Sequence, residues 1–409
     1  MSNDKKRWLI LALGILVNIC QGGAYAFGVF RAPLAGLLGV TPKDPGLALA
    51  FSLMLACLPV GMLLSGKIVD KSGPKLVILV GGLVLGAGFF LSGFTSSFMW
   101  LWITMGVMTS LGSGMAYGAV VSTAVRWFPD RRGLASGLAV SALGIGTLII
   151  SGVAPMIMGP DVATDPSRVL VALKTLGVIF TVVIAASSFL MASPPAGYLP
   201  EGFVPKATGT GSIAPDVSWT TMVGTGRFWF LFVMYLLGVA PGFMLLPSIK
   251  ALAEPIMAPA LTLLVTGIVA GLSNSFGRMF WGAVSDKLTR IYAIVLMFAV
   301  SSAFMFLMPI MMDKSVTMVP AMVLVLLCYG GYLGIFPSLC AESFGGKNMS
   351  VNYGVLFISF SISGLLAPQV MARVDGPVTA FMIAGIVAFV GMAFAIAGLM
   401  QERATVAAK

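Results

Sequence analysis

Apolar runs that are long enough to cross a membrane follow one another along almost the whole of this 409-residue chain. A membrane-spanning helix needs about 20 consecutive, mostly apolar residues. Twelve runs meet this requirement, with approximate bounds 8–30, 47–69, 76–96, 99–126, 133–157, 168–193, 228–250, 258–285, 291–312, 317–341, 350–372 and 377–400. Charged residues make up 9% of the chain, against about 25% in soluble domains. The sequence therefore predicts an all-α membrane protein of twelve transmembrane helices.

One long polar stretch, 193–227, interrupts the apolar runs and is rich in Pro, Gly and Thr. We interpret it as a linker, which predicts an N-terminal six-helix bundle at 1–193, a linker at 194–227 and a C-terminal six-helix bundle at 228–409. Lys and Arg are more frequent in the segments on the N-terminal side of the membrane, so the positive-inside rule places both termini and the linker in the cytoplasm. We expect the cytoplasmic (inner) membrane as the location. We attribute the net charge of +10 to membrane topology and not to nucleic-acid binding.

The two predicted halves match each other at one constant spacing in residue number. The matched pairs are Gly61 and Gly277, Gly66 and Gly282, Asp70 and Asp286, Lys71 and Lys287, Gly114 and Gly330, Gly118 and Gly334, Ser122 and Ser338, and Phe128 and Phe344. Parallel six-helix repeats of this kind are typical of alternating-access transporters, whose binding site lies between the halves near the bilayer midplane. The glycines and serines of each half recur every four residues, a spacing that lets another helix approach closely.

Acidic and basic residues follow the ends of the predicted helices at 66–75, 282–290 and 126–132. We expect Asp70, Lys71, Asp286, Lys287, Arg131 and Arg132 to form salt bridges that hold one conformation and break in another. Solvated turns without such a role are the alternative interpretation.

Arg278 is the single charged residue between Glu254 and Asp286, deep inside an apolar run. No acidic residue of the chain lies in the interior of a predicted span. An unpaired Arg at the centre of a transmembrane helix costs about 2.5–3.5 kcal/mol on insertion scales. Extension of the side chain to the membrane surface is one way to lower this cost, but Asp286 lies about 12 Å further along the helix at about 1.5 Å per residue. We therefore expect Arg278 to bind the carboxylate of an anionic substrate through paired hydrogen bonds.

Further residues are candidates for the same binding site. They are Asn274, one helical turn before Arg278, the tyrosines Tyr117 and Tyr329 in Gly-rich helices, and the apolar residues Phe357 and Leu143. The amide and the hydroxyls would donate hydrogen bonds, and the apolar pair would surround the substrate tail. Satisfied backbone carbonyls for the tyrosines and ordinary core packing for the apolar pair are the alternatives.

Several segments resemble a known family. The loop "GKIVDKSGPK" (66–75) and its partial copy at 282–290 resemble the loop motif of the major facilitator superfamily. The segment "RWFPDRRGLASGLAVSALG" (126–144) is similar to the monocarboxylate transporters. The segments "GRMFWGAVSDKLTR" (277–290) and "NYG" (352–354) are similar to the bacterial oxalate/formate antiporter branch. The resemblance implies the major facilitator fold, in which an arginine at the place of Arg278 binds the anion.

The resemblance also bears on the substrate and on coupling. Antiporters that carry dicarboxylates have a second cation in helix 11, where this chain has Phe360. This favours a small monocarboxylate such as L-lactate or pyruvate. Proton-coupled relatives have a lysine and an aspartate where this chain has Val29 and Asn274. Proton symport remains the expected mode, with the proton carried on the desolvated substrate carboxyl, and anion exchange is the alternative.

Other classes of function fit the composition less well. The chain has no histidine and no cluster of metal-binding residues, and its four cysteines lie in apolar segments, so we expect no enzyme activity, no metal and no cofactor. A sensor or scaffold would be expected to carry a longer cytoplasmic segment, and a cation exporter would carry a buried acid. We expect a monomer whose partners are the substrate, the proton and the lipid bilayer.

Overall fold

The computed structural model describes residues 3–204, 215–258, 261–262, 265, 268–374 and 376–407. This described part of the chain contains helices, turns and no β-strand. It divides into two compact units. The first unit consists of residues 1–128, 142–201 and 347–355, and the second of residues 129–141, 202–346 and 356–409. The sequence-based division at 194–227, part of which lies outside the described residues, remains a prediction.

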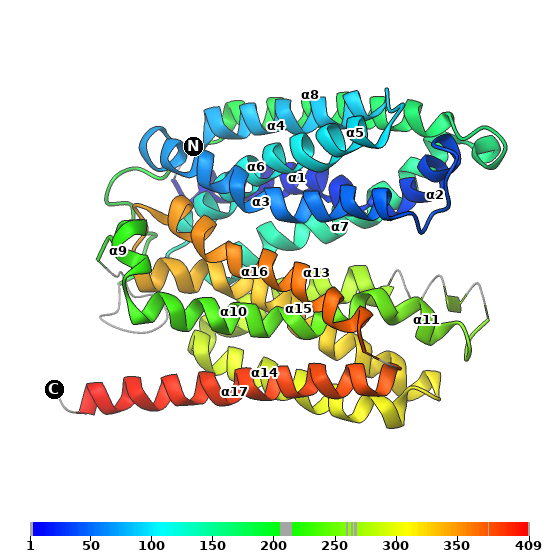
Figure 1. The fold of residues 1–409 in the computed structure, drawn as a ribbon. Helices are drawn as coiled ribbons and strands as arrows, with labels where there is room; N and C mark the ends of the chain where they lie inside the picture. The colour runs from blue at the N-terminus through cyan, green and yellow to red at the C-terminus, as the bar shows by residue number, and fades with distance from the viewer. Residues whose placement is uncertain are drawn as a thin grey trace. The chain divides into compact units, whose positions relative to one another are not determined.

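The first half of the chain runs through ten helical elements (Figure 1). They are α1 (Asn3–Tyr25), α2 (Phe27–Leu37), α3 (Pro45–Ser72), α4 (Pro74–Ser92), α5 (Phe98–Leu101), a π-helical segment (Trp102–Met108), α6 (Thr109–Trp127), α7 (Arg132–Met158), a 3₁₀ turn (Pro160–Ala163) and α8 (Arg168–Leu190). Within the first unit, α4 lies against α6 and α8, and α3 lies against α6.

The second half begins with the short helix α9 and alternates short elements with longer helices. The elements are α9 (Trp219–Val223), α10 (Gly226–Leu245), a 3₁₀ turn (Leu246–Ser248), α11 (Ile249–Ala253), a π-helical segment (Ile268–Ser273), α13 (Asn274–Lys287), α14 (Arg290–Met311), α15 (Ser315–Phe344), α16 (Met349–Ala372) and α17 (Pro377–Ala407). Within the second unit, α13 and α14 both lie against α15, and α14 also packs on α17.

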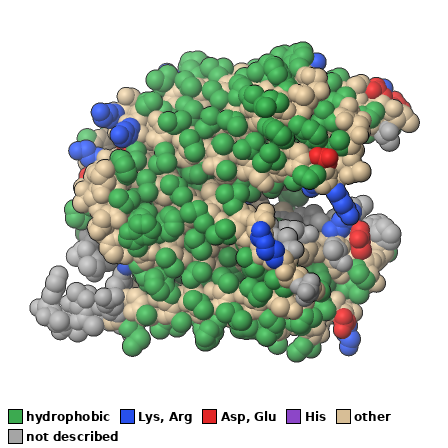
Figure 2. Space-filling view, viewed as in Figure 1, with side chains coloured by type: hydrophobic (Ala, Val, Ile, Leu, Met, Phe, Trp, Pro, Cys, Tyr) green, Lys and Arg blue, Asp and Glu red, His purple; other side chains and the backbone are tan. Residues whose placement is uncertain are grey.

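Ten of the described helices are long and apolar enough to span a membrane. They coincide with ten of the twelve runs expected from the sequence, the first of them combining α1 and α2. The expected span 99–126 is present as a continuous helical stretch that a π-helical segment divides. Part of the expected span 258–285 falls on residues that are not described. Hydrophobic side chains cover most of the face visible in Figure 2, as expected for a surface that contacts lipid.

Local sequence signals explain several helix ends. Asp44 accepts a hydrogen bond from the Gly46 N–H at 2.7 Å, with Pro45 in the first turn of α3, a standard arrangement at a helix N-terminus. Between α3 and α4, Gly73 has a φ of 82°, which favours glycine over any other residue. Pro74 follows in the first turn of α4. The glycine and proline of the loop at 66–75 thus form the turn between these two helices.

The internal repeat reappears in the helix contacts. In the first unit, a Cβ at Gly114 would overlap with the carbonyl oxygen of Leu58, so α6 touches the backbone of α3. In the second unit, a Cβ at Gly330 would overlap with the carbonyl oxygen of Asn274 in the same way, and α15 touches α13. Leu58 and Asn274 are themselves equivalent positions of the repeat. The two halves therefore use the same backbone contacts, as the pseudo-symmetric fold predicted from the sequence requires.

We expect Gly114→Ala to destabilise the protein by about 1–3 kcal/mol, because the added methyl group meets a backbone carbonyl that has no room to move. Gly152→Ala on α7 is the matched control, since a Cβ there meets nothing within 4 Å. The control should be neutral or slightly stabilising. Thermal unfolding of both variants in detergent tests this, and equal melting temperatures would contradict the contact.

Candidate functional site

Glycines of two neighbouring helices hold the backbone of Arg278. A Cβ at Gly137 of α7 or at Gly334 of α15 would overlap with the Arg278 carbonyl oxygen. Helix α13 itself begins at Asn274, directly after the π-helical segment that ends at Ser273. Such irregular turns are frequent at functional sites in helical proteins. Arg278 is therefore fixed where three helices meet at backbone distance.

The guanidinium of Arg278 is buried, with the residue 6% exposed. Its Nε donates to Oδ1 of Asn274 at 3.2 Å, and its Nη1 donates to the carbonyl oxygen of Val140 at 2.7 Å. Asn274 precedes Arg278 by one turn, so the side chain extends toward the beginning of α13 and away from Asp286. To reach the membrane surface at the Asp286 end of α13, the side chain would have to extend in the opposite direction.

The hydrogen-bond donors of Arg278 are only partly used within the described residues. A guanidinium has five N–H groups, and two of them donate to Asn274 and Val140. Among the residues that the structure describes, no acidic side chain lies within 4.0 Å of Arg278. Both of its acceptors are neutral oxygens, so the positive charge has no counter-charge within this part of the chain. The remaining N–H groups can bind a carboxylate in two parallel hydrogen bonds.

Arg290, in the same unit, is a buried arginine whose positive charge is balanced by carboxylates. It is 3% exposed and donates two hydrogen bonds to the carboxylate of Glu342, at 2.9 and 3.2 Å. It also forms an ion pair with Asp286 at 2.7 Å and donates to Ser285 at 2.6 Å. Two carboxylates thus surround this second buried guanidinium. The charge of Arg290 is therefore balanced by carboxylates of its own unit, whereas the acceptors of Arg278 among the described residues are neutral.

An aromatic cluster lies on α10, α15 and α16 of the second unit. Tyr329, next to Gly330 on α15, packs against Phe243 with ring centroids 5.3 Å apart. Phe243 contacts Phe360 at 5.0 Å, and Phe360 contacts Phe357 at 4.7 Å. The structure therefore brings the predicted residues Asn274 and Arg278 into direct contact and joins Tyr329 to Phe357 through two further rings.

The predicted residues Tyr117 and Leu143 belong to the first unit. The hydroxyl of Tyr117, which is 2% exposed, lies 3.3 Å from the hydroxyl of Tyr353 at the start of α16. Leu143 is 4% exposed, and its carbonyl oxygen lies where a Cβ at Gly22 of α1 would be. Their role in binding a substrate stays a prediction. Tyr353 was not among the sequence candidates, although it lies in the quoted segment "NYG".

Asp70 stabilises the beginning of α16. Its two carboxylate oxygens accept hydrogen bonds from the N–H groups of Ser350 at 3.3 Å and Val351 at 3.4 Å. The same carboxylate forms an ion pair with Arg126 of α6. A negative charge at a helix N-terminus is favourable because the backbone N–H groups there carry partial positive charge.

Asp286 makes the same arrangement at the beginning of α7. Its oxygens accept from the N–H groups of Gly133 at 2.9 Å and Leu134 at 2.8 Å, while Arg290 binds the same carboxylate. Asp70 and Asp286 are repeat-related acids that lie in the last turns of α3 and α13, and not after the helix ends as the sequence predicted, because both helices continue past these residues. Each one therefore ties a helix N-terminus to the C-terminal turn of a helix that is distant in sequence.

The basic residues predicted for these salt bridges divide into two groups. Lys71, Lys287 and Arg131 are exposed, and Arg131 lies 3.7 Å from its neighbour Asp130. Arg132 is 7% exposed and interacts electrostatically with Glu342. The acids Asp70 and Asp286 instead pair with Arg126 and Arg290, which were not predicted from the sequence. The internal repeat could have pointed to these two positions, since Arg126 and Glu342 are both charged and are equivalent in the two halves.

The family model of the Major Facilitator Superfamily matches residues 11–368. The chain belongs to this superfamily. Its members are transporters and not enzymes, so the chain is a multi-pass membrane transporter.

Known proteins add detail to this assignment. The chain is 26% identical over 396 residues to the oxalate:formate antiporter of Oxalobacter formigenes, covering 95% of this chain and 90% of that protein. It is 24% identical over 391 residues to monocarboxylate transporter 12-B of Danio rerio, covering 89% and 80%. The crystal structure of the superfamily transporter FucP superposes with a TM-score of 0.73 at 13% identity, over 95% of this chain and 98% of that one. At this identity the likeness to FucP shows the fold alone.

We expect Glu342→Gln to destabilise the protein by about 1.5–3 kcal/mol, because it removes a charged hydrogen-bond partner from a buried guanidinium. The side chains of Arg290 and Glu342 are 3% and 6% exposed. Glu254→Gln is the control, since Glu254 pairs with Lys250 where both side chains are about 60% exposed, and exposed pairs contribute little. Thermal unfolding in detergent compares the two. A control that is as destabilised as Glu342→Gln would show that burial of the pair does not matter.

Proposed function

We propose that this chain is a secondary active transporter of a small monocarboxylate, such as L-lactate or pyruvate, and that Arg278 binds the carboxylate. One observation carries the proposal. The guanidinium is buried with unused N–H groups, and in the described residues its acceptors are two neutral oxygens. A substrate carboxylate would supply the missing negative charge. The similarity to an oxalate:formate antiporter and to a monocarboxylate transporter supports an anionic substrate.

The number of cations supports a singly charged substrate. Phe360, the position where a second cation is expected in carriers of dicarboxylates, lies between Phe243 and Phe357 in the aromatic cluster. An apolar surrounding opposes the burial of a second carboxylate, because an unpaired buried charge is costly. We therefore place monocarboxylates above oxalate as substrates. Asn274 holds the guanidinium in position, and Tyr329 and Phe357 contribute to the wall of the site.

Proton symport is the mode of coupling that we propose, with the proton carried on the substrate carboxyl. Exchange of one anion for another is the second candidate. It is favoured by the contacts of Arg278 in the described residues, where neither acceptor is a group that takes up a proton near neutral pH. We further propose an inner-membrane location, cytoplasmic termini and a monomeric carrier.

Asp70 and Asp286, each of which caps the N-terminus of a helix, are our candidates for control of the conformational cycle. Asp70 and Asp286 each bind the N-terminus of a helix that begins in one compact unit and ends in the other. We propose that these hydrogen bonds and ion pairs form in one state of the transport cycle and break in another. Arg132 lies beside the second of them.

We expect Arg278→Gln to abolish the uptake of L-lactate into proteoliposomes under a pH gradient with the interior alkaline. Arg278→Lys should retain less than about a tenth of the activity, because an ammonium group does not reproduce the planar, paired donors of a guanidinium. Arg373→Gln is the matched control, since Arg373 follows the end of α16, is exposed, and its side chain donates only to Gln369 among the described residues.

The same assay separates the two modes of coupling. Uptake that is driven by the pH gradient into empty vesicles indicates symport. Uptake that requires unlabelled lactate or formate inside the vesicles indicates exchange. Full activity of Arg278→Gln in either format would contradict the role of Arg278.

We expect Asp286→Asn to slow counterflow of labelled lactate by about tenfold while the affinity for lactate changes less than threefold. The substitution removes the negative charge from the start of α7 and from Arg290 but leaves Arg278 untouched. Lys287→Gln, an exposed neighbour, serves as the control. Equal counterflow rates in the two variants would argue against a role of the cap in the cycle.

A further inference from the structure

Arg31, in the first unit, is another arginine whose charge is not balanced within the described residues. It lies on α2 and directly follows the expected span 8–30, at the end of this span away from the N-terminus. The residue is half-buried, and its Nε is buried without a hydrogen-bond partner among the described residues. Within the same residues it forms no ion pair. A buried N–H group without a partner in the chain leaves a donor for a bound ion or water molecule.

The connecting loop that touches α2 holds its acids against a different arginine. A Cβ at Gly36 of α2 would lie 3.0 Å from the ring of Pro166, so the loop before α8 packs against α2. Arg168 forms ion pairs with the two acids of this loop, with Asp161 at 3.0 Å and with Asp165 at 3.8 Å. Neither acid therefore balances the charge on α2.

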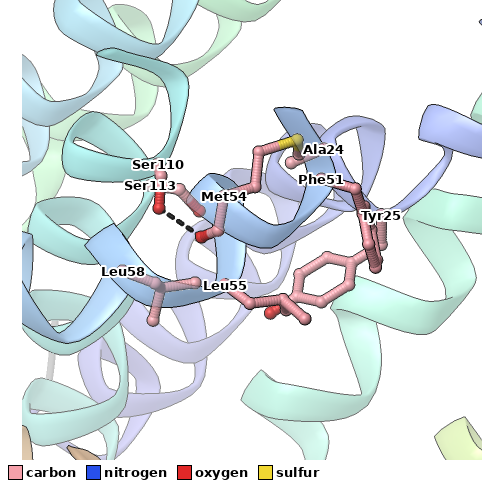
Figure 3. A pocket seen from close by; sticks show the side chains of 8 residues that line it. All are labelled: Ala24, Tyr25, Phe51, Met54, Leu55, Leu58, Ser110 and Ser113. Carbon is pink, nitrogen blue, oxygen red and sulfur yellow. Dashed lines mark hydrogen bonds between the residues drawn. The ribbon is translucent and has the colours of Figure 1, made fainter. Parts of the chain in front are cut away.

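The packing of α2 on α3 provides no counter-charge either. Phe27 precedes Arg31 by one turn on the same face of α2, and it stacks on Phe51 of α3 with ring centroids 6.1 Å apart. Phe51 lines a pocket between α1, α3 and α6, together with apolar side chains and the hydroxyls of Ser110 and Ser113 (Figure 3). None of these described lining residues is acidic.

Arg31 differs from Arg278 in its access to solvent. Arg278 is 6% exposed, whereas Arg31 is half-buried at the end of a membrane span. A cation that is partly shielded from water attracts an anion more strongly than a fully exposed one, because apolar surroundings lower the local dielectric constant. The planar guanidinium suits a carboxylate, which it can bind through two parallel hydrogen bonds. These are the properties of an anion site that is reached from the membrane surface.

We propose that Arg31 binds the carboxylate of the transported monocarboxylate at the membrane surface, as a second anion site that belongs to the first unit alone. The substrate class rests on the proposed function. The site is weaker than the one at Arg278, because Arg31 keeps partial contact with water and partly exposed charge pairs contribute little. Its effect is to raise the concentration of the substrate anion at this surface of the protein.

The test is saturation-transfer NMR of L-lactate with the purified full-length protein in phosphatidylcholine nanodiscs. The Arg278→Gln variant lacks the main proposed site, and we expect it to bind L-lactate with reduced affinity. Addition of Arg31→Gln to this variant should weaken the remaining binding by about three- to fivefold, as expected for a partly exposed charge pair. Addition of Lys43→Gln is the matched control, because it removes an exposed positive charge from the same unit, and it should leave the affinity unchanged.

Arg31→Lys keeps the charge but not the paired donors, so it should weaken binding less, and it serves as the second variant if Arg31→Gln does not fold. The inference is overturned if the wild type binds L-lactate and Arg278→Gln binds none, or if the substitutions of Arg31 and Lys43 have equal effects. Loss of the Arg278→Gln signal in nanodiscs that contain phosphatidylglycerol would assign Arg31 to a lipid phosphate and would also overturn it. If the wild type itself binds no L-lactate, the proposed function falls as well, so the two failures are distinguishable.

Discussion

A permanent positive charge inside a helix bundle of low dielectric constant needs a negative partner, and Arg278 has none among the described residues. Neutral oxygens from Asn274 and Val140 satisfy two of its N–H groups but do not balance its charge. The position itself is enforced by glycines on α7 and α15 that touch the Arg278 backbone. The protein thus keeps a charged group where it is energetically unfavourable, a feature that is characteristic of ion and substrate pathways in membranes.

The internal repeat explains how both halves of the chain use the same backbone contacts while their side chains differ. Gly114 against Leu58 and Gly330 against Asn274 are the same contact made twice. Asp70 and Asp286 are the same helix cap made twice. At these positions the backbone geometry is the same in both halves while the side chains differ. Arg278, for example, lies in the second half.

The sequence predicted the architecture well because hydropathy and glycine spacing determine it directly. Twelve apolar runs and one internal repeat were enough to predict the helices and their pseudo-symmetry. The contact of Asn274 with Arg278 also followed, since residues one turn apart share a helix face. The hydrogen bond from Arg278 to the Val140 carbonyl could not be predicted, because nothing in the sequence identifies a backbone acceptor on another helix. The pairing of Asp286 with Arg290, in place of a neighbouring lysine, depends on how the loop folds and was equally inaccessible.

The most direct measurement is an experimental structure of the protein with 3-bromopropionate, whose bromine marks the alkyl end and whose carboxylate marks the other. The account predicts both carboxylate oxygens within about 3.2 Å of the Arg278 guanidinium nitrogens, as expected for a paired, charge-assisted hydrogen bond. A ligand bound elsewhere, with Arg278 still donating only to Asn274 and Val140, would contradict the central claim that the substrate supplies the missing charge.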